Sequence, residues 1–191
     1  DTEYLVSGNF SMSEGTTLTI LPGVNLKMSD DVVILINGDI NSVGTPENRI
    51  IFSAENNSWK GIILGSVANA NFEFCVFKNI CCKWNSFVLQ NNYGSDLSVK
   101  NSLIFDNSTH LIQSSNTYVG LQIFENVNIY DNLSLTLYSS SDSHINLISS
   151  NLIRNNKGLT SSILEFQRVD IAPGRAFNYN NIFDNDFYGN T

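Results

Sequence analysis

Ile104-Phe105-Asp106-Asn107 returns 25 residues later as Ile129-Tyr130-Asp131-Asn132, and three further segments follow the same pattern. Each copy has an aliphatic residue, a second apolar residue that is usually aromatic, a charged residue and then Asn. The other copies are Val76-Phe77-Lys78-Asn79, Leu152-Ile153-Arg154-Asn155 and Ile182-Phe183-Asp184-Asn185. The five Asn positions are 28, 25, 23 and 30 residues apart. This spacing is too irregular for heptads or propeller blades but is typical of a solenoid whose loops vary in length.

Short apolar segments bounded by Gly, Pro, Asn or Asp fill the first 70 residues. Residues 17–28 alternate apolar and polar side chains around Pro22-Gly23, which indicates two strands joined by a turn. Further strands are expected over residues 32–36, 49–54 and 59–65. No apolar stripe with a 3.6-residue period and helical length occurs anywhere in the chain, so we expect an all-β protein.

The repeat predicts how the coils of residues 71–191 are built. A short strand leads into each copy, over residues 71–74, 96–99, 120–123, 144–147 and 176–179. With the remaining apolar segments this makes about three strands per coil, and successive coils stack in parallel about 4.8 Å apart. At about 25 residues per coil, the 191 residues make a single domain of seven or eight coils. Residues 1–70 are expected to form an N-terminal cap and the first coils.

Five early segments and the later repeat point to a known family. The early segments are residues 18–24 (LTILPGV), 37–40 (NGDI), 44–47 (GTPE), 50–53 (IIFS) and 59–62 (WKGI). They resemble the opening coils of right-handed parallel β-helices of the pectate-lyase-like superfamily, and the Phe-x-Asn signatures are similar to its coil repeats. The resemblance spans nearly the whole chain and implies a single-stranded right-handed parallel β-helix. It implies less about function, because that superfamily includes lyases, glycoside hydrolases, phage tailspikes, adhesins and noncatalytic surface proteins.

Composition limits the partners of the chain. Charged residues make up 15% of it and the formal net charge is −8, so neutral polar residues must cover most of the surface. The ten Lys and Arg residues form no cluster, which argues against a nucleic-acid partner. No apolar run approaches the roughly 20 residues of a membrane span.

Stacked coils turn each position of the signature into a column, and the Asn column is expected to be structural. It contains Asn79, Asn107, Asn132, Asn155 and Asn185. Asn is the non-glycine residue that best tolerates the left-handed conformation of a bend. Stacked Asn amides also hydrogen-bond to one another or to the backbone. We therefore interpret the column as a ladder.

The charge column contains the sharpest catalytic hint. Adjacent coils would place Asp106 and Asp131 about 5 Å apart, close to the carboxylate separation of a retaining glycosidase and suitable for Ca²⁺. Lys78 and Arg154 flank the two acids in the same column. A solvated ladder of ion pairs is therefore the main interpretation, and no cofactor is expected unless Ca²⁺ binds at this pair.

Two neighbouring apolar columns pose a geometric question. One runs through Ile104 and Ile129, and the other through Phe105 and Tyr130. Successive side chains of a strand point to opposite faces, so both columns cannot face the core of a regular strand. Either the backbone bends between them or one column lies outside, where it would form an apolar stripe for a partner.

Three cysteines lie close together, at positions 75, 81 and 82. A zinc site would need a second pair of ligands, and His110 and His144 are distant in sequence. We interpret the cysteines as small apolar residues that fill turns, with a single disulfide and one cysteine left over as the alternative. Neighbouring strand residues face opposite ways, so at most one of Cys81 and Cys82 lies in the core.

Four Asn-x-Ser/Thr motifs mark acceptors for N-linked glycans. Two of them, at Asn107 and Asn132, coincide with the Asn ladder, where an amide is not free to carry a glycan. The motifs at Asn9 and Asn56 fall in expected loops, and these two residues are the predicted glycosylation sites.

We expect a noncatalytic module that is secreted or at the cell surface and serves as an adhesin, surface or filament-forming protein. The Gly-His-Gly and Arg-x-Lys signatures of polygalacturonases do not occur. No basic or apolar leader follows Asp1, so we expect any secretion signal to have been removed or never to have been present. The sequence of residues 187–191 indicates no cap, so we expect the chain either to have been cut from a longer protein or to meet a neighbour there.

Self-association through the solenoid ends or an apolar stripe is accordingly expected. The alternative function is a polysaccharide-acting enzyme or carbohydrate-binding module on the same fold. In that case Asp106 and Asp131 would serve as acid and nucleophile or as cation ligands.

Overall fold

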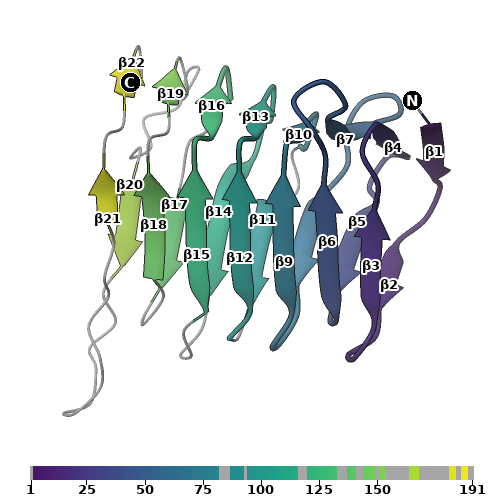
Figure 1. The fold of residues 1–191 in the computed structure, drawn as a ribbon, viewed down its shortest axis with the longest axis horizontal. Helices are drawn as coiled ribbons and strands as arrows, with labels where there is room; N and C mark the ends of the chain where they lie inside the picture. Colours follow the sequence, from purple (N-terminus) through teal and green to yellow (C-terminus); the bar gives the residue numbers. More distant parts are fainter. Residues whose placement is uncertain are drawn as a thin grey trace.

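The chain folds as a three-sided parallel β-solenoid (Figure 1). The computed structural model describes residues 2–81, 87–92, 94–115, 120–132, 137–140, 144–148, 151–153, 164–167, 181–183 and 186–188, with side chains in 2–81, 88–90, 94–109 and 120–132. Within these ranges every regular element is a β-strand, which confirms the all-β prediction. No helix in the described ranges is long and apolar enough to cross a membrane.

Three sheets form the sides of the solenoid (Figure 1). Sheet A consists of β1 (Thr2–Val6), β4 (Val24–Met28), β7 (Ile50–Ala54), β10 (Cys75–Lys78), β13 (Leu103–Phe105), β16 (Asn128–Tyr130), β19 (Asn151–Ile153) and β22 (Asp186–Tyr188). Sheet B consists of β2 (Phe10–Met12), β5 (Val33–Ile36), β8 (Gly61–Leu64), β11 (Phe87–Asn92), β14 (His110–Ser115), β17 (Leu137–Ser140) and β20 (Leu164–Gln167). Sheet C consists of β3 (Thr17–Ile20), β6 (Asp39–Val43), β9 (Asn69–Glu73), β12 (Asp96–Lys100), β15 (Leu121–Glu125), β18 (His144–Ile148) and β21 (Asn181–Phe183).

Each coil passes through sheets A, B and C in turn, so the described strands make seven three-stranded coils and β22 begins an eighth. The front strands of sheet C run upward in Figure 1, the chain crosses sheet A, and the rear strands of sheet B run downward while the chain advances leftward. This path is right-handed, as crossovers between parallel strands almost always are. The predicted three strands per coil and seven or eight coils are confirmed. Residues 2–12, expected within a cap, supply the coil strands β1 and β2.

The core is built from columns of inward-facing side chains. On sheet A, Phe52 pairs in register with Phe77, Phe77 with Ile104, and Ile104 with Ile129. These four residues are 0% exposed. The rings of Phe52 and Phe77 stack with centroids 5.0 Å apart, and Phe72 of sheet C meets both rings edge-on. Because a slip of one residue would turn these rings outward, the cluster fixes the register of the first coils.

The first copy of the signature is offset by one residue from the predicted columns. Phe77, not Val76, pairs with Ile104, and Lys78 pairs with Phe105. The physical reason is burial, since the inward column takes the large ring of Phe77, which stacks on Phe52.

The last copy is also misplaced in the prediction. Residues 181–183 form β21 of sheet C, where Ile182 pairs with Leu147. The sheet A strand of this level is β22, where Phe187 pairs with Leu152. The leading strands predicted over residues 71–74, 96–99, 120–123 and 144–147 are confirmed by β9, β12, β15 and β18, although Phe74 and Gly120 lie just outside β9 and β15. The strand predicted over 176–179 lies outside the described residues.

Left-handed residues form the corners between sheets. At the corner from sheet A to sheet B, here the A–B corner, Asn79, Asp106 and Asp131 have φ values of 59°, 53° and 54°. The sequence predicted a left-handed Asn at this bend. In the second and third copies the left-handed residue is instead the acid that precedes it. Asn101 and Asn126 have φ values of 51° and 53° at the corner from sheet C to sheet A.

Candidate functional site

The repeated Asn of the signature is a structural residue at the A–B corner in its second and third copies. Asn107 and Asn132 are 1% and 0% exposed. Asn107 Nδ2 donates hydrogen bonds to Asn132 Oδ1 at 2.9 Å and to the Phe77 carbonyl oxygen at 3.2 Å. The Ile80 N–H donates to Asn107 Oδ1 at 3.0 Å, and Asn132 Nδ2 donates to the Ile104 carbonyl oxygen at 3.1 Å. These contacts satisfy backbone groups where the chain leaves sheet A, which confirms a ladder for these two residues.

The other three Asn residues of the predicted column are not seen in this ladder. Asn79 is not part of the ladder, because Ile80 occupies that level and donates its N–H to Asn107. Asn155 and Asn185 lie outside the described residues.

The predicted acid pair also lies at the A–B corner. Asp106 and Asp131 follow Phe105 and Tyr130, which pair in register, so the two acids occupy successive coils. Asp106 is exposed and Asp131 is half-buried. Their roles as acid and nucleophile, or as Ca²⁺ ligands, stay a prediction. Among the side chains that the structure describes, no three His, Cys, Asp or Glu residues form a group able to hold a metal ion.

The predicted ladder of ion pairs, with Lys78 and Arg154 flanking the two acids, is wrong at its first position. Lys78 shares a column with Phe105 rather than with Asp106. Its Nζ lies 5.9 Å from the centroid of the Phe105 ring, where a cation is attracted to the ring face. Arg154, the predicted cation at the other end, lies outside the described residues.

The second apolar column lies on the outside of sheet A. Ile104 is buried, the next residue Phe105 is half-buried, and the left-handed bend comes only at Asp106. Of the two possibilities left open by the sequence, a bend between the columns is therefore wrong and an outer column is right. The Phe105 and Tyr130 rings stack with centroids 4.9 Å apart and planes at 8°, so their faces cover one another. Self-association through this stripe, or through the solenoid ends, stays a prediction.

The described cysteines are structural. Cys75 is a free, buried thiol whose Sγ lies 3.4 Å from Ser42 Oγ. Burial raises the pKa of this thiol to about 12, so it is not a reactive thiolate at neutral pH. Cys81 is disulfide-bonded. Cys75 is a small buried residue, as interpreted, but it lies in strand β10 rather than in a turn. The disulfide alternative fits Cys81, and Cys82 lies outside the described residues.

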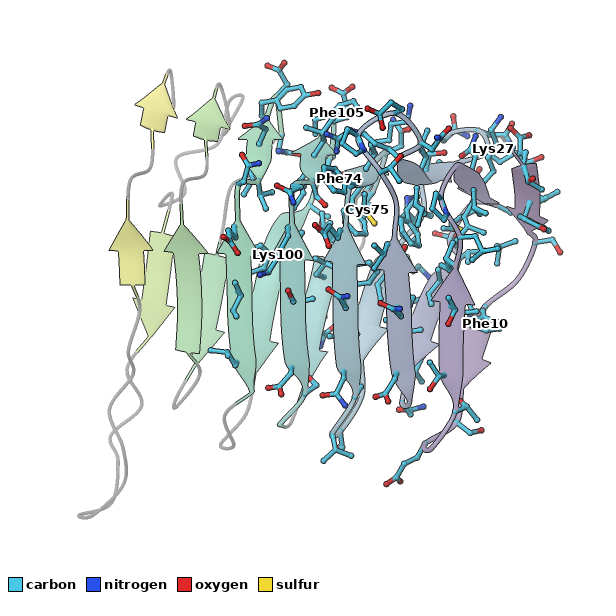
Figure 2. The ribbon with its side chains drawn as sticks, in the orientation of Figure 1. Phe10, Lys27, Phe74, Cys75, Lys100 and Phe105 are labelled. Atoms are coloured by element: carbon cyan, nitrogen blue, oxygen red, sulfur yellow. The ribbon has the colours of Figure 1, made fainter. Side chains whose placement is uncertain are left out.

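A groove of about 420 Å³ runs across the outer face of sheet C. Strand alternation creates it, because β6 and β9 each expose their first and third residues and bury their second and fourth. Figure 2 shows side chains with oxygen and nitrogen atoms along this front face. The polar lining consists of Thr17, Asp39, Asn41, Asn69, Asn71, Asp96 and Ser98, and the apolar lining of Ile40, Ala70, Leu97, Leu121 and Ile123.

Hydrogen bonds between coils hold the polar side chains of this groove in two rows. Asn69 Nδ2 donates to Asp39 Oδ1 at 2.8 Å, and Asn71 Nδ2 donates to Asn41 Oδ1 at 3.0 Å. Asp96 Oδ1 accepts the backbone N–H of the next coil's Leu121 at 2.7 Å. The groove therefore presents ordered amide and carboxylate groups on a surface that is otherwise mainly apolar.

No residue of this groove is among the predicted site residues, and neither Asp106 nor Asp131 lines it. The signature directed attention to the A–B corner, whereas the groove comes from the strands that lead into each copy. One signal in the sequence marks it: the first exposed position of successive leading strands. This column reads Thr17, Asp39, Asn69 and Asp96 in the observed register.

Fold and groove together define a parallel β-solenoid with a groove along one face. A 58-residue part of the chain is 33% identical to Protein bark beetle of Drosophila melanogaster, and this similarity covers 30% of the chain and 2% of that protein. The chain thus spans a small fraction of that relative's length. No family model matches the chain, and no solved structure matches it. The parallel β-helix prediction fits the structure, while no family match supports the pectate-lyase-like assignment.

Proposed function

We propose that the chain is a noncatalytic, secreted or cell-surface module of adhesin type that binds a neutral glycan in the groove of sheet C. The observation that carries this proposal is the pair of hydrogen-bonded rows, Asp39 with Asn69 and Asn41 with Asn71. Side chains that are already ordered lose little conformational entropy when a ligand binds. Amides and carboxylates in such rows offer the paired donors and acceptors that sugar hydroxyls require.

The charge of the groove favours a neutral ligand. Asp39 and Asp96 line it, and no Lys or Arg is among its lining residues. The whole chain has a formal charge of −8. An acidic polysaccharide would therefore be repelled both by the groove and by the net charge of the protein.

The arrangement of the two groove acids argues for binding rather than hydrolysis. Asp39 and Asp96 belong to strands on either side of β9, so they stand about 10 Å apart by strand spacing. An inverting glycosidase keeps a similar separation free for the attacking water. Here Asn69 occupies the position between the acids and donates its amide to Asp39.

A glycan array tests this proposal. The secreted chain is probed against neutral, sialylated and uronate-containing glycans, and we expect signals on neutral glycans alone. The double variant Asn41→Ala/Asn71→Ala removes the row of two amides, and a loss of one or two hydrogen bonds lowers affinity by about tenfold. The control Glu3→Ala/Lys27→Ala removes an ion pair of 3.1 Å on sheet A and also leaves the net charge unchanged.

If the groove variant and the control variant bound glycans with equal affinity, the groove of sheet C would not be the binding site. A preference for acidic glycans would contradict the choice of ligand. Release of reducing sugar from any bound glycan would show that the chain is an enzyme and would contradict a noncatalytic function.

A further inference from the structure

All four Asn-x-Ser/Thr motifs lie at the same corner of the solenoid. Asn9 lies between β1 and β2, Asn56 between β7 and β8, Asn107 two residues after the end of β13, and Asn132 two residues after the end of β16. Each of these connections leads from sheet A to sheet B. The four motifs thus differ not in their place in the coil but in what surrounds the Asn amide.

The side-chain amides of Asn107 and Asn132 are buried and hydrogen-bonded within the corner. Asn107 Nδ2 and Asn132 Nδ2 donate hydrogen bonds inside the corner, and the two residues are 1% and 0% exposed. A sugar on either nitrogen would break the ladder and require space that the core does not have.

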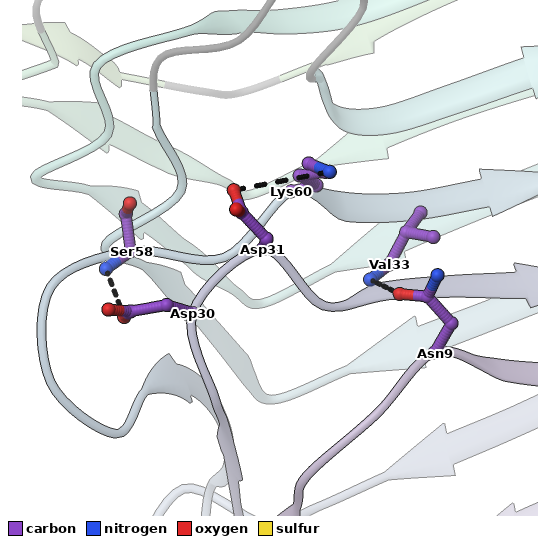
Figure 3. Close-up of polar contacts among 6 residues, drawn as sticks. All are labelled: Asn9, Asp30, Asp31, Val33, Ser58 and Lys60. Carbon is purple, nitrogen blue, oxygen red and sulfur yellow. Dashed lines mark hydrogen bonds and ion pairs between the residues drawn. The ribbon is translucent and has the colours of Figure 1, made fainter.

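Asn9 has the opposite environment. Its side chain is exposed, and its Oδ1 accepts the Val33 N–H at 3.0 Å (Figure 3). That hydrogen bond uses the carbonyl oxygen and leaves Nδ2, the atom that carries an N-linked glycan, outside the contact. Ser11, which completes the motif, is exposed as well.

Asn56 lies in an exposed turn that a neighbouring coil holds in place. The Asp30 carboxylate accepts the Asn57 Nδ2 at 3.2 Å, the Asn57 N–H at 3.3 Å and the Ser58 N–H at 3.4 Å, the last drawn in Figure 3. These hydrogen bonds lower the pKa of Asp30, with the Asn57 side chain as the largest cause. The turn is therefore ordered through its other residues, and Asn56 itself is exposed.

We propose that Asn9 and Asn56 carry N-linked glycans and that Asn107 and Asn132 carry none. In the transfer, Nδ2 bonds to C1 of an oligosaccharide carried on a lipid pyrophosphate. The bond from C1 to the pyrophosphate oxygen breaks, the lipid pyrophosphate leaves, and Nδ2 loses a proton. The acceptor amide is a neutral donor before and after, so Asn9 Oδ1 still accepts the Val33 N–H.

Both glycans would project from one edge of the solenoid. Asn9 and Asn56 belong to the first and third coils, so they stand about 10 Å apart along the axis by strand spacing. The A–B corner does not border sheet C, so glycans at this corner leave the groove open. The modification goes beyond the proposed binding function and depends only on passage through a glycosylating secretory route.

The test is to secrete the chain from mammalian cells and to compare its mass before and after peptide-N-glycosidase F. We expect two glycans on the unmodified sequence, one on Asn9→Gln or Asn56→Gln, and none on the double variant. Because Asn9→Gln also disturbs the contact with Val33, Ser11→Ala and Ser58→Ala remove each acceptor motif while keeping the Asn. Asn107→Gln and Asn132→Gln are expected to leave the glycan count unchanged.

Absence of a glycan from either Asn9 or Asn56 of the secreted protein overturns the proposal, as does a glycan on Asn107 or Asn132 of folded protein. Glycan-array binding by the enzymatically deglycosylated chain is measured separately. A failure of glycosylation is thereby distinguished from a failure of the groove to bind.

Discussion

Sheets A and C follow the same alternation of inner and outer side chains, yet their outer faces differ. On sheet A the outer Phe105 and Tyr130 stack upon each other and remain half-buried. On sheet C the outer Asp39, Asn69 and Asn71 are exposed over a groove. The most visible repeat in the sequence therefore builds the solenoid, and the less regular strands that precede it carry the groups available to a ligand.

The largest expected effect separates the inner from the outer aromatic residues of sheet A. Phe77→Ala removes a fully buried ring that contacts Phe52 and Phe72, and should lower the free energy of unfolding by about 3–5 kcal/mol. Phe105→Ala removes an outer stacked ring and should cost about 1 kcal/mol. Urea denaturation measures both. Equal losses of stability in the two variants would mean that Phe77 and Phe105 occupy equivalent positions, as the signature predicted, and would contradict the observed register.

A smaller effect compares buried and exposed Asn amides. Asn107→Ala should lower the free energy of unfolding by about 1–3 kcal/mol, because it removes the side chain that accepts the Ile80 N–H and donates to the Phe77 carbonyl inside the corner. Asn71→Ala removes an exposed hydrogen bond on sheet C and should change stability by at most about 0.5 kcal/mol. Thermal and urea unfolding of both variants would show this contrast. A comparable cost for the two would mean that the rows of sheet C are structural as well.

The inner face of sheet C offers a stabilising change. Gln122 pairs with Leu97 in an inward column and is 0% exposed, and neither its Nε2 nor its Oε1 has a hydrogen-bond partner. Because an unsatisfied buried polar group is costly, Gln122→Leu should raise the free energy of unfolding by about 1–2 kcal/mol. Gln90→Leu on sheet B, at a half-buried position, is the comparison variant. A loss of stability in Gln122→Leu would show that the amide is satisfied in solution.

The smallest effect concerns pH at the A–B corner. The folded pKa of Asp30 is lowered from its ordinary value of 3.8 by hydrogen bonds from Asn57 and Ser58. Its contribution to stability is therefore present above pH 3.8 and is lost as the pH falls through the folded pKa. The melting temperature of the unmodified chain should exceed that of Asp30→Ala at neutral pH, and the difference should vanish in acid. A difference that persists at the lowest pH would assign it to packing rather than to the charge.

Much of the fold was predictable because alternation and turn residues are local signals. Residues 17–28 around Pro22-Gly23 predict β3 and β4, and the leading strands predict the positions of β9 and β12. Register was harder, because matching Phe77 to Phe105 follows the letters of the signature. The structure instead pairs Phe77 with Ile104, since volume and burial decide which residue faces the core.

The groove could not be predicted from the signature, because it depends on residues far apart in sequence. Asp39 and Asn69 are separated by 30 positions, yet they meet through their side chains in neighbouring coils. Only the register of sheet C places these residues in rows and leaves them exposed. The sequence does single out Asp106 and Asp131. These acids recur at a regular spacing because each takes the left-handed conformation at the A–B corner of its coil.

Backbone amide shifts in NMR spectra test the central claim most directly. The labelled chain is titrated with the neutral oligosaccharide that gives the strongest array signal. If sheet C binds it, the largest shift changes fall on β6, β9 and β12, and Asn41→Ala/Asn71→Ala weakens the titration while Glu3→Ala/Lys27→Ala does not. Shift changes centred on the A–B corner around Asp106 and Asp131 instead, with β6 and β9 unaffected, would contradict the account.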